Sequence, residues 1–554
     1  MSIHTFLKGS EDWWRQAVVY QIYPRSFADS NSDGIGDLKG IISRVPYLKS
    51  LGIDAVWLSP FYPSALADGG YDVDDYRNVD PRIGTLKDFD KMIDALHAEG
   101  IRVFVDIVPN HSSDQHVWFQ AALNAGPGSP ERDRYIFRNG KGEHGAIRPS
   151  ELVSHFGPTA WTRVTEPDGS LGQWYLHLFA KEQPDFNWDN PEVREDFIHT
   201  LRFWSNRGVD GFRIDVAHAL VKDLSEPLFE RQSYDVSVMK DDGTDKLFDR
   251  DEVHKIYRSW RKVFNEYDPP RVAVAEAWVP ANRRPAYASK DGLGQAFNFD
   301  LLGTPWNAKK FRKTIDYNLV EAIKAGSSTT WVFSNHDVIR HATRFGLPAG
   351  FDWVRWYQSQ GTDPKPNNIL GLARAKAATM LILALPGSTY LYQGEELGLF
   401  EAPEIPSDQM QDPQWFRNPG KAGSRDGCRV PLPWAIEGKS FGFGKKGSHL
   451  PQPTWFGDLS VEAQDSNPDS TLSLYREALA LRKQLQTEES LTWVDHFFNR
   501  NVVHFKRQNG WHSITNFGDM AIKLPAGEVL LSSAPVVGRW LPANATAWVQ
   551  TATV

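Results

Sequence analysis

Hydrophobic residues in this chain gather in short unbroken runs, and segments with helical spacing separate these runs. An unbroken run of Val, Ile, Leu and Phe is typical of a parallel strand that is buried on both faces. Eight runs predict strands, at Val18–Tyr23, Ala55–Ser59, Val103–Val108, Gly211–Asp215, Val272–Glu276, near Ala296–Phe299, Thr330–Ser334 and Thr389–Gln393. Eight such strands alternating with helices predict an α/β fold, a (β/α)8 barrel whose last helix is Ser470–Gln484.

Two stretches do not follow this alternation. About 75 residues rich in Gly, Pro and aromatic residues follow the third strand, far more than an ordinary barrel loop holds. We interpret His111 to about Pro184 as an inserted small domain that forms one wall of the site. After about Gln486 the apolar runs become short and alternating, which predicts an antiparallel β-sandwich. The expected division is 1–110 and 185–485 for the barrel, 111–184 for the insertion and 486–554 for the C-terminal domain.

Composition narrows the possible partners and compartments. The 554 residues are 41% hydrophobic and 23% charged, which is ordinary for a globular protein. A formal charge of −8 gives no electrostatic reason to bind nucleic acid or an anionic membrane. Cys428 is the single cysteine, and the N-terminus has no basic start followed by an apolar core. We therefore expect a cytoplasmic protein that binds neither nucleic acid nor membrane and is a monomer or a homodimer.

Carboxylates follow three of the buried strands directly or closely. Asp215 ends the run GFRID, and Glu276 ends the run VAVAE. Asp337 is the last residue of FSNHD and follows the seventh strand closely. The carboxyl ends of barrel strands all lie at one edge, where barrel enzymes keep their chemistry. We expect the three carboxylates to converge there. Two opposed carboxyl groups are what the cleavage of a glycosidic bond requires.

The segments that carry these residues closely resemble the signature regions of glycoside hydrolase family 13, the α-amylase family. They are Asp106–His111 (DIVPNH), Gly211–Val216 (GFRIDV), Val274–Trp278 (VAEAW) and Phe333–Asp337 (FSNHD). The stretch Gln183–Trp188 (QPDFNW) is similar to the fifth signature in its oligo-1,6-glucosidase and α-glucosidase form. Gln21–Phe27 and Tyr392–Glu396 extend the resemblance to the first and eighth strands.

The resemblance implies roles for the three carboxylates. Asp215 would be the nucleophile, Glu276 the acid/base, and Asp337 the residue that binds two sugar hydroxyls. Arg213 lies two positions before Asp215, so both side chains point to the same side of the strand. A guanidinium there is expected to favour the ionised form of Asp215.

The resemblance also implies residues that bind the sugar. His111 and His336 would hydrogen-bond its hydroxyls, and Tyr71 would stack on its ring. Asp72 would bind further hydroxyls and pair with Arg429, which would close the pocket and make the enzyme exo-acting. The remaining two are Phe156, expected at the pocket rim, and Arg340, expected near the sugar on the leaving-group side.

Val216 directly follows the nucleophile and bears on linkage preference. In the resembling subgroup Val at this position goes with α-1,6 cleavage, whereas Ala or Thr goes with α-1,4 cleavage. The next pair, Ala217-His218, departs from the Ile-Asn type that is common there. A dual or broad linkage preference therefore stays open.

The segment from Asp29 to Asp37 places oxygen-bearing residues at alternate positions around a glycine, as the first half of an EF-hand loop does. The twelfth position is Gly40 in place of Glu, and a strand precedes the loop. The resemblance implies a structural Ca²⁺, with Mg²⁺ as the alternative, held by Asp29, Asn31, Asp33, the Ile35 carbonyl and Asp37. An acidic turn without an ion is the other interpretation. No organic cofactor is expected.

Together these features predict a retaining exo-α-glucosidase that acts on short α-glucosides such as maltose and isomaltose. A transglucosylase or sucrose isomerase would use the same intermediate with a sugar acceptor, so this reading stays open, as does action on sucrose or trehalose. An endo-amylase is disfavoured by the closed pocket. A non-catalytic relative is disfavoured because all three carboxylates are present and no membrane segment is found.

Overall fold

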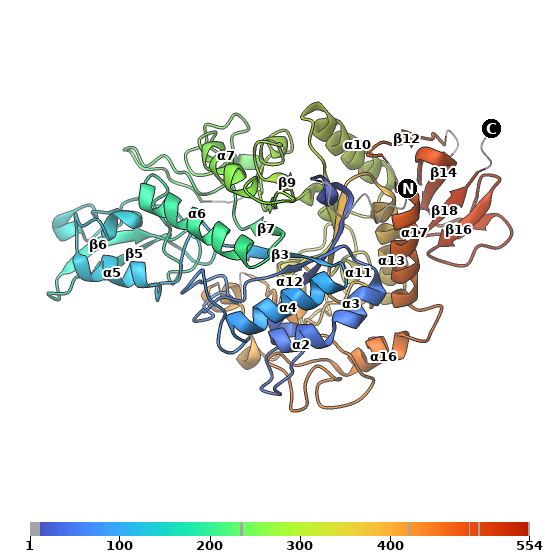
Figure 1. The fold of residues 1–554 in the computed structure, drawn as a ribbon, viewed down its shortest axis with the longest axis horizontal. Helices are drawn as coiled ribbons and strands as arrows, with labels where there is room; N and C mark the ends of the chain where they lie inside the picture. The colour runs from blue at the N-terminus through green and yellow to red at the C-terminus, as the bar shows by residue number, and fades with distance from the viewer. Residues whose placement is uncertain (1–10, 233–235, 419–421, 487, 497–498, 552–554) are drawn as a thin grey trace.

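A computed structural model describes residues 11–232, 236–418, 422–486, 488–496 and 499–551. Eight parallel strands form one sheet in the order β10-β11-β1-β2-β3-β7-β8-β9, at the centre of the molecule (Figure 1). Their bounds are β1 Val18–Ile22, β2 Ala55–Leu58, β3 Arg102–Ile107, β7 Gly211–Ile214, β8 Val272–Ala275, β9 Gly294–Ala296, β10 Thr330–Val332 and β11 Ser388–Tyr392. The predicted barrel is confirmed, and seven of its strands lie where the apolar runs place them.

The sixth strand is shorter and earlier than predicted. β9 ends at Ala296, and Asn298 then caps α9, where its side chain accepts a hydrogen bond from the Asp300 amide. β9 and β10 stand at the two ends of the order of described strands and are not paired through backbone hydrogen bonds. The Thr330 side chain links them instead: its hydroxyl donates to the Ala296 carbonyl at 2.8 Å and accepts from the Asn298 amide at 3.1 Å. The barrel is therefore nearly closed, with a hydroxyl at its seam.

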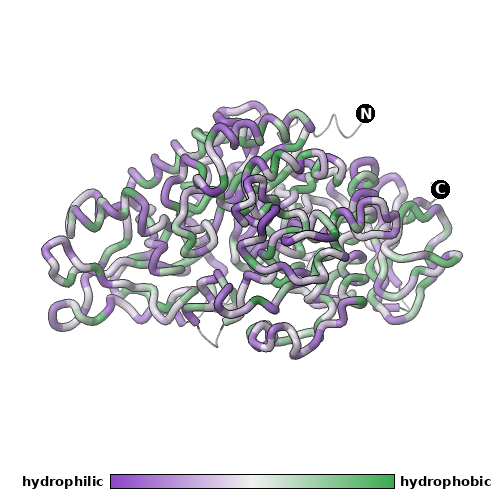
Figure 2. Tube along the Cα trace, turned by 90° about the horizontal axis from the view of Figure 1, so that it is seen from below, coloured by the Kyte–Doolittle hydropathy of each residue, from purple (hydrophilic) through white to green (hydrophobic). Residues whose placement is uncertain are grey.

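Side chains from both faces of the strands are buried, which explains the unbroken apolar runs. One face fills the barrel interior with large residues such as Trp57, Phe104 and Phe297. The opposite face packs on the surrounding helices, and the hydropathy trace of Figure 2 shows hydrophobic stretches running through the interior. The helices are α2 Leu38–Ser43, α3 Val45–Leu51, α4 Leu86–Ala98, α5 Val117–Ala125, α6 Pro191–Asn206, α7 Val253–Phe264, α8 Arg284–Tyr287, α9 Phe299–Leu302, α10 Ala308–Lys324, α11 His341–Arg344, α12 Trp353–Gln358, α13 Asn368–Ala384, α14 Pro413–Arg417, α15 Asp426–Arg429, α16 Val461–Gln464 and α17 Thr471–Leu485.

Local sequence fixes where the long barrel helices begin. The residue before each helix accepts a hydrogen bond from an amide of the first turn and so satisfies a donor that has no partner within the helix. These caps are Thr85, Asn190, Asn307, Asn367 and Ser470. The last cap confirms the predicted final helix to within one residue.

A three-stranded antiparallel sheet lies within the predicted insertion, at the left of Figure 1. Its strands are β4 Phe137–Arg138, β5 Trp161–Thr165 and β6 Leu171–Leu176, in the order β4-β6-β5. An isolated bridge between His111 and Asp185 joins the two ends of the insertion, and one between Tyr135 and Phe186 joins its interior to the returning chain. The insertion therefore leaves the barrel and returns to it at one point beside the site.

The C-terminal residues form a five-stranded antiparallel sheet, in the order β12-β13-β14-β18-β16. Its strands are β12 Thr492–Trp493, β13 Val502–Lys506, β14 Trp511–Asn516, β16 Glu528–Ser532 and β18 Ala545–Gln550. A second, two-stranded sheet pairs β15 Ile522–Lys523 with β17 Trp540–Leu541. These two strands are too short to show alternation, so the sequence did not predict them.

Helix α13 lies between the barrel and the C-terminal sheet, so almost its whole second half is buried. From β18, Thr546 donates a hydrogen bond to the Ala377 carbonyl at 2.7 Å, and Trp548 donates to the Met380 carbonyl at 3.2 Å. This double packing accounts for the longest apolar run in the sequence. Within the described part of the chain, no helix has the length and apolar character needed to cross a membrane.

Candidate active site

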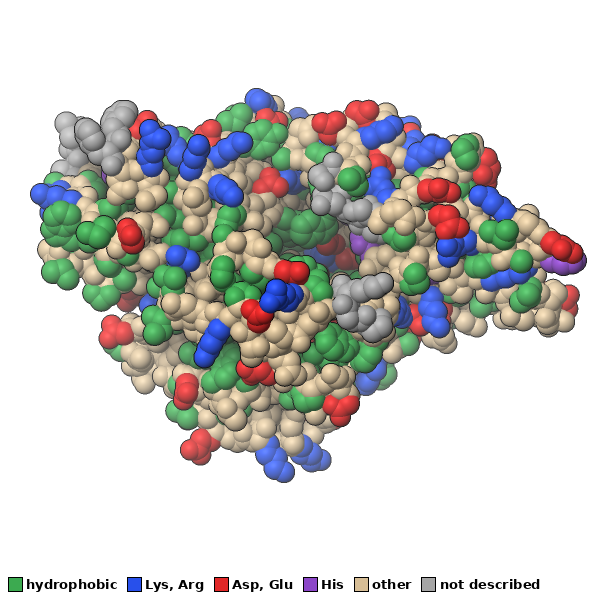
Figure 3. All heavy atoms as spheres, turned by 180° about the vertical axis from the view of Figure 1, so that it is seen from behind, with side chains coloured by type: hydrophobic (Ala, Val, Ile, Leu, Met, Phe, Trp, Pro, Cys, Tyr) green, Lys and Arg blue, Asp and Glu red, His purple; other side chains and the backbone are tan. Residues whose placement is uncertain are grey.

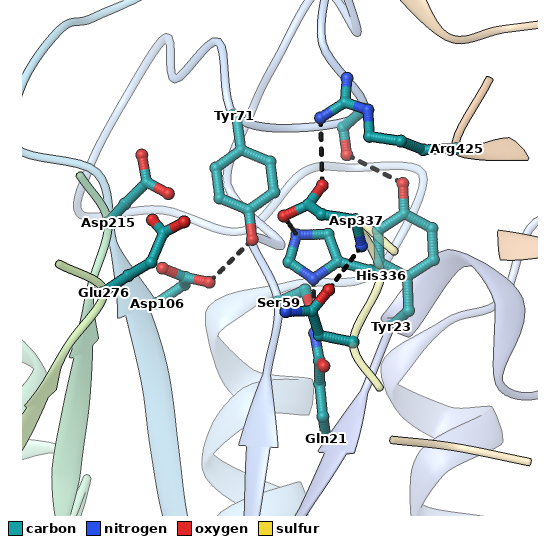
Figure 4. A network of polar contacts seen from close by, with 12 residues as sticks. Gln21, Tyr23, Ser59, Tyr71, Asp106, Asp215, Glu276, His336, Asp337 and Arg425 are labelled. Carbon is teal, nitrogen blue, oxygen red and sulfur yellow. Dashed lines mark hydrogen bonds and ion pairs between the residues drawn. The ribbon is translucent and has the colours of Figure 1, made fainter. Parts of the chain in front are cut away.

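The predicted carboxylates meet at the carboxyl edge of the barrel. Asp215 directly follows β7, Glu276 directly follows β8, and Asp337 lies in the loop after β10. Figure 4 shows Asp215 and Glu276 with Asp106 on one side of Tyr71, and Asp337 with Arg425 on the other. The three carboxylates therefore converge at one edge of the barrel, as their positions at the strand ends predict.

Arg213, on β7, binds three carboxylates at once. Its guanidinium lies 2.5 Å from an oxygen of Asp215, 2.9 Å from Asp106 and 2.8 Å from Glu276. Asp106 also accepts a hydrogen bond from the Tyr71 hydroxyl at 3.0 Å. Asp106 lies in one of the signature segments, but no role was predicted for it. The sequence contained a signal for such a role, because Asp106 is a charged residue inside a buried strand.

One guanidinium cannot neutralise three buried carboxylates. Burial raises the pKa of Asp106 to about 7, despite its contact with Arg213. Burial also raises the pKa of Asp215, and the charges of Glu276 and Asp106 add to this effect while Arg213 opposes it. Arg213 thus favours the ionised form of Asp215, as its spacing predicts, but burial and the two neighbouring carboxylates outweigh this effect. Asp106 and Asp215 therefore bind protons more readily than free carboxyl groups do, and the charge of Asp106 acts on Asp215.

Both oxygens of Glu276 are held by hydrogen bonds. The indole of Trp278 donates to one oxygen at 3.0 Å, and the backbone amide of Val216 donates to the other at 3.0 Å. Val216 reaches this position with a φ of 43°, a left-handed conformation that is rare for a β-branched residue. Such strain is typical of functional sites. The side chain of Val216 packs in an apolar cluster at the cavity wall.

Asp337 lies among cationic side chains on the other side of Tyr71. Arg425 and Arg429 contact its carboxylate at 3.1 and 2.8 Å, and the His336 ring lies 3.3 Å away. Burial acts to raise the pKa of Asp337, but His336, Arg425 and Arg429 outweigh it and hold the pKa well below its usual range. Asp337 is thus an ionised acceptor, and the Tyr71 ring stacks on His336 beside it, with 5.2 Å between the ring centroids.

The predicted ion pair between Asp72 and Arg429 is wrong. Asp72 is fully buried and accepts hydrogen bonds from the amides of Ala67 and Asp68, at 2.9 and 3.0 Å. Burial raises its pKa to about 6, despite these amides. Arg429 instead binds Asp337 and the His336 carbonyl.

The pair that lines the cavity is Asp68 with Arg425, whose charged groups lie 2.7 Å apart. Gly69 and Gly70 have φ values of 60° and 107°, which permit a tight turn between Asp68 and Tyr71. This turn directs Asp72 back onto the loop backbone and leaves Asp68 facing the site. The sequence contained both aspartates of ADGGYD, but only the turn decides which one faces the cavity.

Arg340 also differs from its predicted place. Its guanidinium is buried and donates to the carbonyls of Gln393 and Cys428, at 2.8 and 2.9 Å, while it packs over the Tyr392 ring. It therefore joins backbone segments and does not line the cavity. Phe156 does line the cavity, and the Arg425 guanidinium lies 5.1 Å from its ring centroid.

His111 lines the cavity as the sequence predicts. Its Nε2 lies 3.2 Å from the Tyr71 carbonyl and 3.1 Å from the side-chain nitrogen of Gln183. Burial lowers its pKa to about 3, so the ring is neutral at pH 7. A neutral ring can both donate and accept hydrogen bonds, as recognition of hydroxyl groups requires.

These residues enclose a cavity of about 330 Å³, and Figure 3 shows acidic and histidine side chains inside a hollow on that face of the molecule. Of the predicted residues, the cavity is lined by Tyr71, His111, Phe156, Asp215, Val216, Glu276 and Asp337. Ten further lining residues were not predicted: Asp68, His155, Phe179, His218, Val236, Met239, Phe248, Trp278, Gln414 and Arg425. Most lie in loops, where no periodic pattern marks them.

The predicted metal loop lies apart from the cavity. Asp29 accepts hydrogen bonds from the amides of Ser32 and Gly34, and Asp33 accepts one from Ile35. Asp37 caps α2 through the Gly40 amide. The loop offers the oxygen ligands that Ca²⁺ prefers. Among the described residues, however, no group of three or more His, Cys, Asp or Glu is arranged to hold a metal ion, and the calcium site stays a prediction.

Comparison with known proteins agrees with this architecture. Residues 21–490 match the model of the alpha amylase catalytic domain. The chain belongs to the alpha-amylase family. As a member of that family it is a glycoside hydrolase, with the barrel and the C-terminal antiparallel sheet described above.

Curated relatives cover most of the chain. A probable alpha-glucosidase of Rhizobium meliloti (strain 1021) is 35% identical, over 86% of this chain and 84% of its own length. An oligo-1,6-glucosidase of Parageobacillus thermoglucosidasius is 33% identical, over 85% of this chain and 84% of its own.

Solved structures of family members superpose over nearly the whole length. An alpha-glucosyl transfer enzyme matches with a TM-score of 0.81 and 32% identity, covering 97% of this chain and 99% of its own. A trehalulose synthase matches with a TM-score of 0.82 and 31% identity, covering 97% and 100%. The relatives therefore include both hydrolases and glucosyl transfer enzymes.

Proposed function

We propose that this protein is a retaining exo-α-glucosidase that removes terminal glucose from short α-glucosides such as maltose and isomaltose. One observation carries the proposal. The cavity has Asp215 and Glu276 on one side of Tyr71, and the ion pairs of Arg425 with Asp68 and Asp337 on the other. A pocket bounded in this way holds one terminal sugar and leaves no channel for a long chain.

The charged groups are arranged for double displacement. Asp215 attacks carbon 1 of the glucose with an electron pair, and the bond to the leaving oxygen breaks as Glu276 gives that oxygen a proton. Glu276 then takes a proton from water, and the resulting hydroxide displaces Asp215, which restores both carboxyl groups.

The opposite side of the cavity binds the sugar that stays behind. Asp337 is held ionised, so it accepts hydrogen bonds from two hydroxyls. Arg425 fixes Asp337 and Asp68 in place and donates to the sugar. The Tyr71 ring, supported by His336, offers an aromatic face to the sugar ring.

The nucleophile is tested by Asp215→Asn. This variant keeps its shape but cannot attack, so kcat should fall by about four orders of magnitude or more while the melting temperature changes little. Release of glucose from maltose and isomaltose, followed by sugar chromatography, gives the rate. Near-normal turnover by the variant, or no cleavage of any α-glucoside by the wild-type enzyme, would refute the proposal.

Glucosyl transfer is a second candidate, and Trp278 favours it. Its indole lies beside Glu276, is 37% exposed and stacks on Phe299 with 4.2 Å between the ring centroids. A fixed aromatic face next to the acid can hold an acceptor sugar in place of water. New trisaccharides at high maltose concentration would show transfer. Glucose as the sole product would show hydrolysis.

A further inference from the structure

Beyond the catalytic groups, His218 is a polar cavity residue that the chemistry above leaves unused. It lines the cavity and is 5% exposed. Its Nδ1 atom is buried and has no hydrogen-bond partner among the described residues. A buried polar atom without a partner costs free energy, so such atoms are rare unless a ligand completes them.

The backbone holds His218 in this place. The left-handed turn at Val216 reverses the chain directly after the nucleophile. The Tyr257 hydroxyl then donates to the Ala217 carbonyl, and the Asp249 amide donates to the His218 carbonyl at 2.7 Å. The His218 ring packs on Phe248 with 4.9 Å between the centroids. The ring is therefore fixed at the wall before any ligand binds.

The charge state of His218 suits the recognition of hydroxyl groups. Burial lowers its pKa to about 4, although the nearby Glu276 carboxylate and backbone act to raise it. The ring is therefore neutral at pH 7. The Glu276 backbone engages one ring nitrogen, and the unpartnered Nδ1 remains for a hydroxyl group.

The position of His218 decides which sugar it meets. In the proposed mechanism Asp337 and Arg425 bind the glucose that becomes bonded to Asp215, and Figure 4 shows both on the other side of Tyr71 from Glu276. The general acid must touch the oxygen of the leaving group, so the leaving sugar lies on the side of Glu276. His218 lies close to Glu276, and both line the cavity.

We propose that His218 is a specificity-determining residue that hydrogen-bonds a hydroxyl of the leaving or acceptor sugar. The proposal rests on the α-glucosidase function proposed above. His218, as well as Val216, would then determine which α-glucosides the enzyme prefers among those that share a terminal glucose. A leaving group without hydroxyls would form no hydrogen bond with His218.

The experiment compares leaving groups. Wild-type enzyme, His218→Phe and His218→Gln are assayed for kcat/KM on maltose, isomaltose and 4-nitrophenyl α-glucoside. Phe keeps the packing on Phe248 but removes both nitrogens, and should lower kcat/KM about tenfold on at least one disaccharide. The aryl glucoside should change by less than about twofold. Gln retains a donor and an acceptor and should recover part of the loss.

Two controls make the result decisive. His254→Phe applies the same change to a half-buried histidine on α7 that does not line the cavity, and kcat/KM should stay unchanged on all three substrates. Circular dichroism and melting temperature test whether each variant folds. If His218→Phe does not fold, then kcat/KM of His218→Gln is compared with that of the wild type on the three substrates.

Equal losses on disaccharides and aryl glucoside would overturn the proposal, because the ring would then act through Glu276 or the fold. No change on any substrate would also overturn it. Failure of the wild-type enzyme to cleave all three would instead count against the α-glucosidase function itself.

Discussion

At the scale of single residues, Arg213 sets the proton balance of the site. Its guanidinium binds Asp106, Asp215 and Glu276, and the charges of Asp106 and Glu276 act against it on the ionisation of Asp215. Sequence spacing correctly placed Arg213 beside Asp215. It could not show that the positive charge is shared, because Asp106 and Glu276 come from neighbouring strands.

Asp106→Asn tests this shared balance. Removing the Asp106 charge should lower the pKa of Asp215, because that charge is one of the causes that raise it. Asp215 must be ionised to attack, so the acid limb of the profile of kcat/KM against pH should move to lower pH. An unchanged acid limb, measured on 4-nitrophenyl α-glucoside, would show that the Asp106 charge does not act on Asp215.

Asp68→Asn tests the corrected pocket pair. Asn cannot form the charged contact with Arg425, so kcat/KM on maltose should fall about 10- to 100-fold. Asp72→Asn is the comparison, since Asp72 faces the loop backbone. The Asp72→Asn variant should have a lower melting temperature than the wild type, and its kcat/KM should fall less than that of Asp68→Asn. The reverse order would restore the original assignment.

At the scale of elements, strand ends and turns determine which side chains reach the cavity. The barrel strands deliver Asp106, Arg213, Asp215 and Glu276 to one edge, as their apolar runs predict. Turns decide which of the remaining side chains and amides face the cavity. The glycine turn before Tyr71 selects Asp68 over Asp72, and the strained turn at Val216 brings its amide to Glu276.

The loop from Asp29 to Asp37 provides a prediction at this scale. If it holds Ca²⁺, then metal-free protein should gain several degrees in melting temperature when millimolar Ca²⁺ is added. Asp33→Ala should abolish this gain, since it removes a ligand of the loop without touching the α2 cap at Asp37. Activity should change little, because no loop residue lines the cavity. An equal gain in the variant would place the ion elsewhere.

At the scale of the whole molecule, the barrel is one layer in a larger packing arrangement. Helix α13 packs against the barrel on one side and the C-terminal sheet on the other, and the insertion is fastened where it leaves the barrel. The cavity collects residues from the barrel, the insertion and the long loops after β7, β8 and β11. Its shape therefore depends on the contacts between these parts.

The sequence by itself determined the barrel, the order of its strands, the insertion, the C-terminal sheet and the three converging carboxylates. Each of these leaves a local pattern, because a buried parallel strand must be apolar along its length and its end must carry the chemistry. Only the tertiary structure decided that Asp68 and Arg425 line the pocket, that Arg340 binds backbone carbonyls and that His218 lines the cavity. These outcomes depend on turn geometry and on contacts between residues far apart in the chain. No periodicity within a single segment records such contacts.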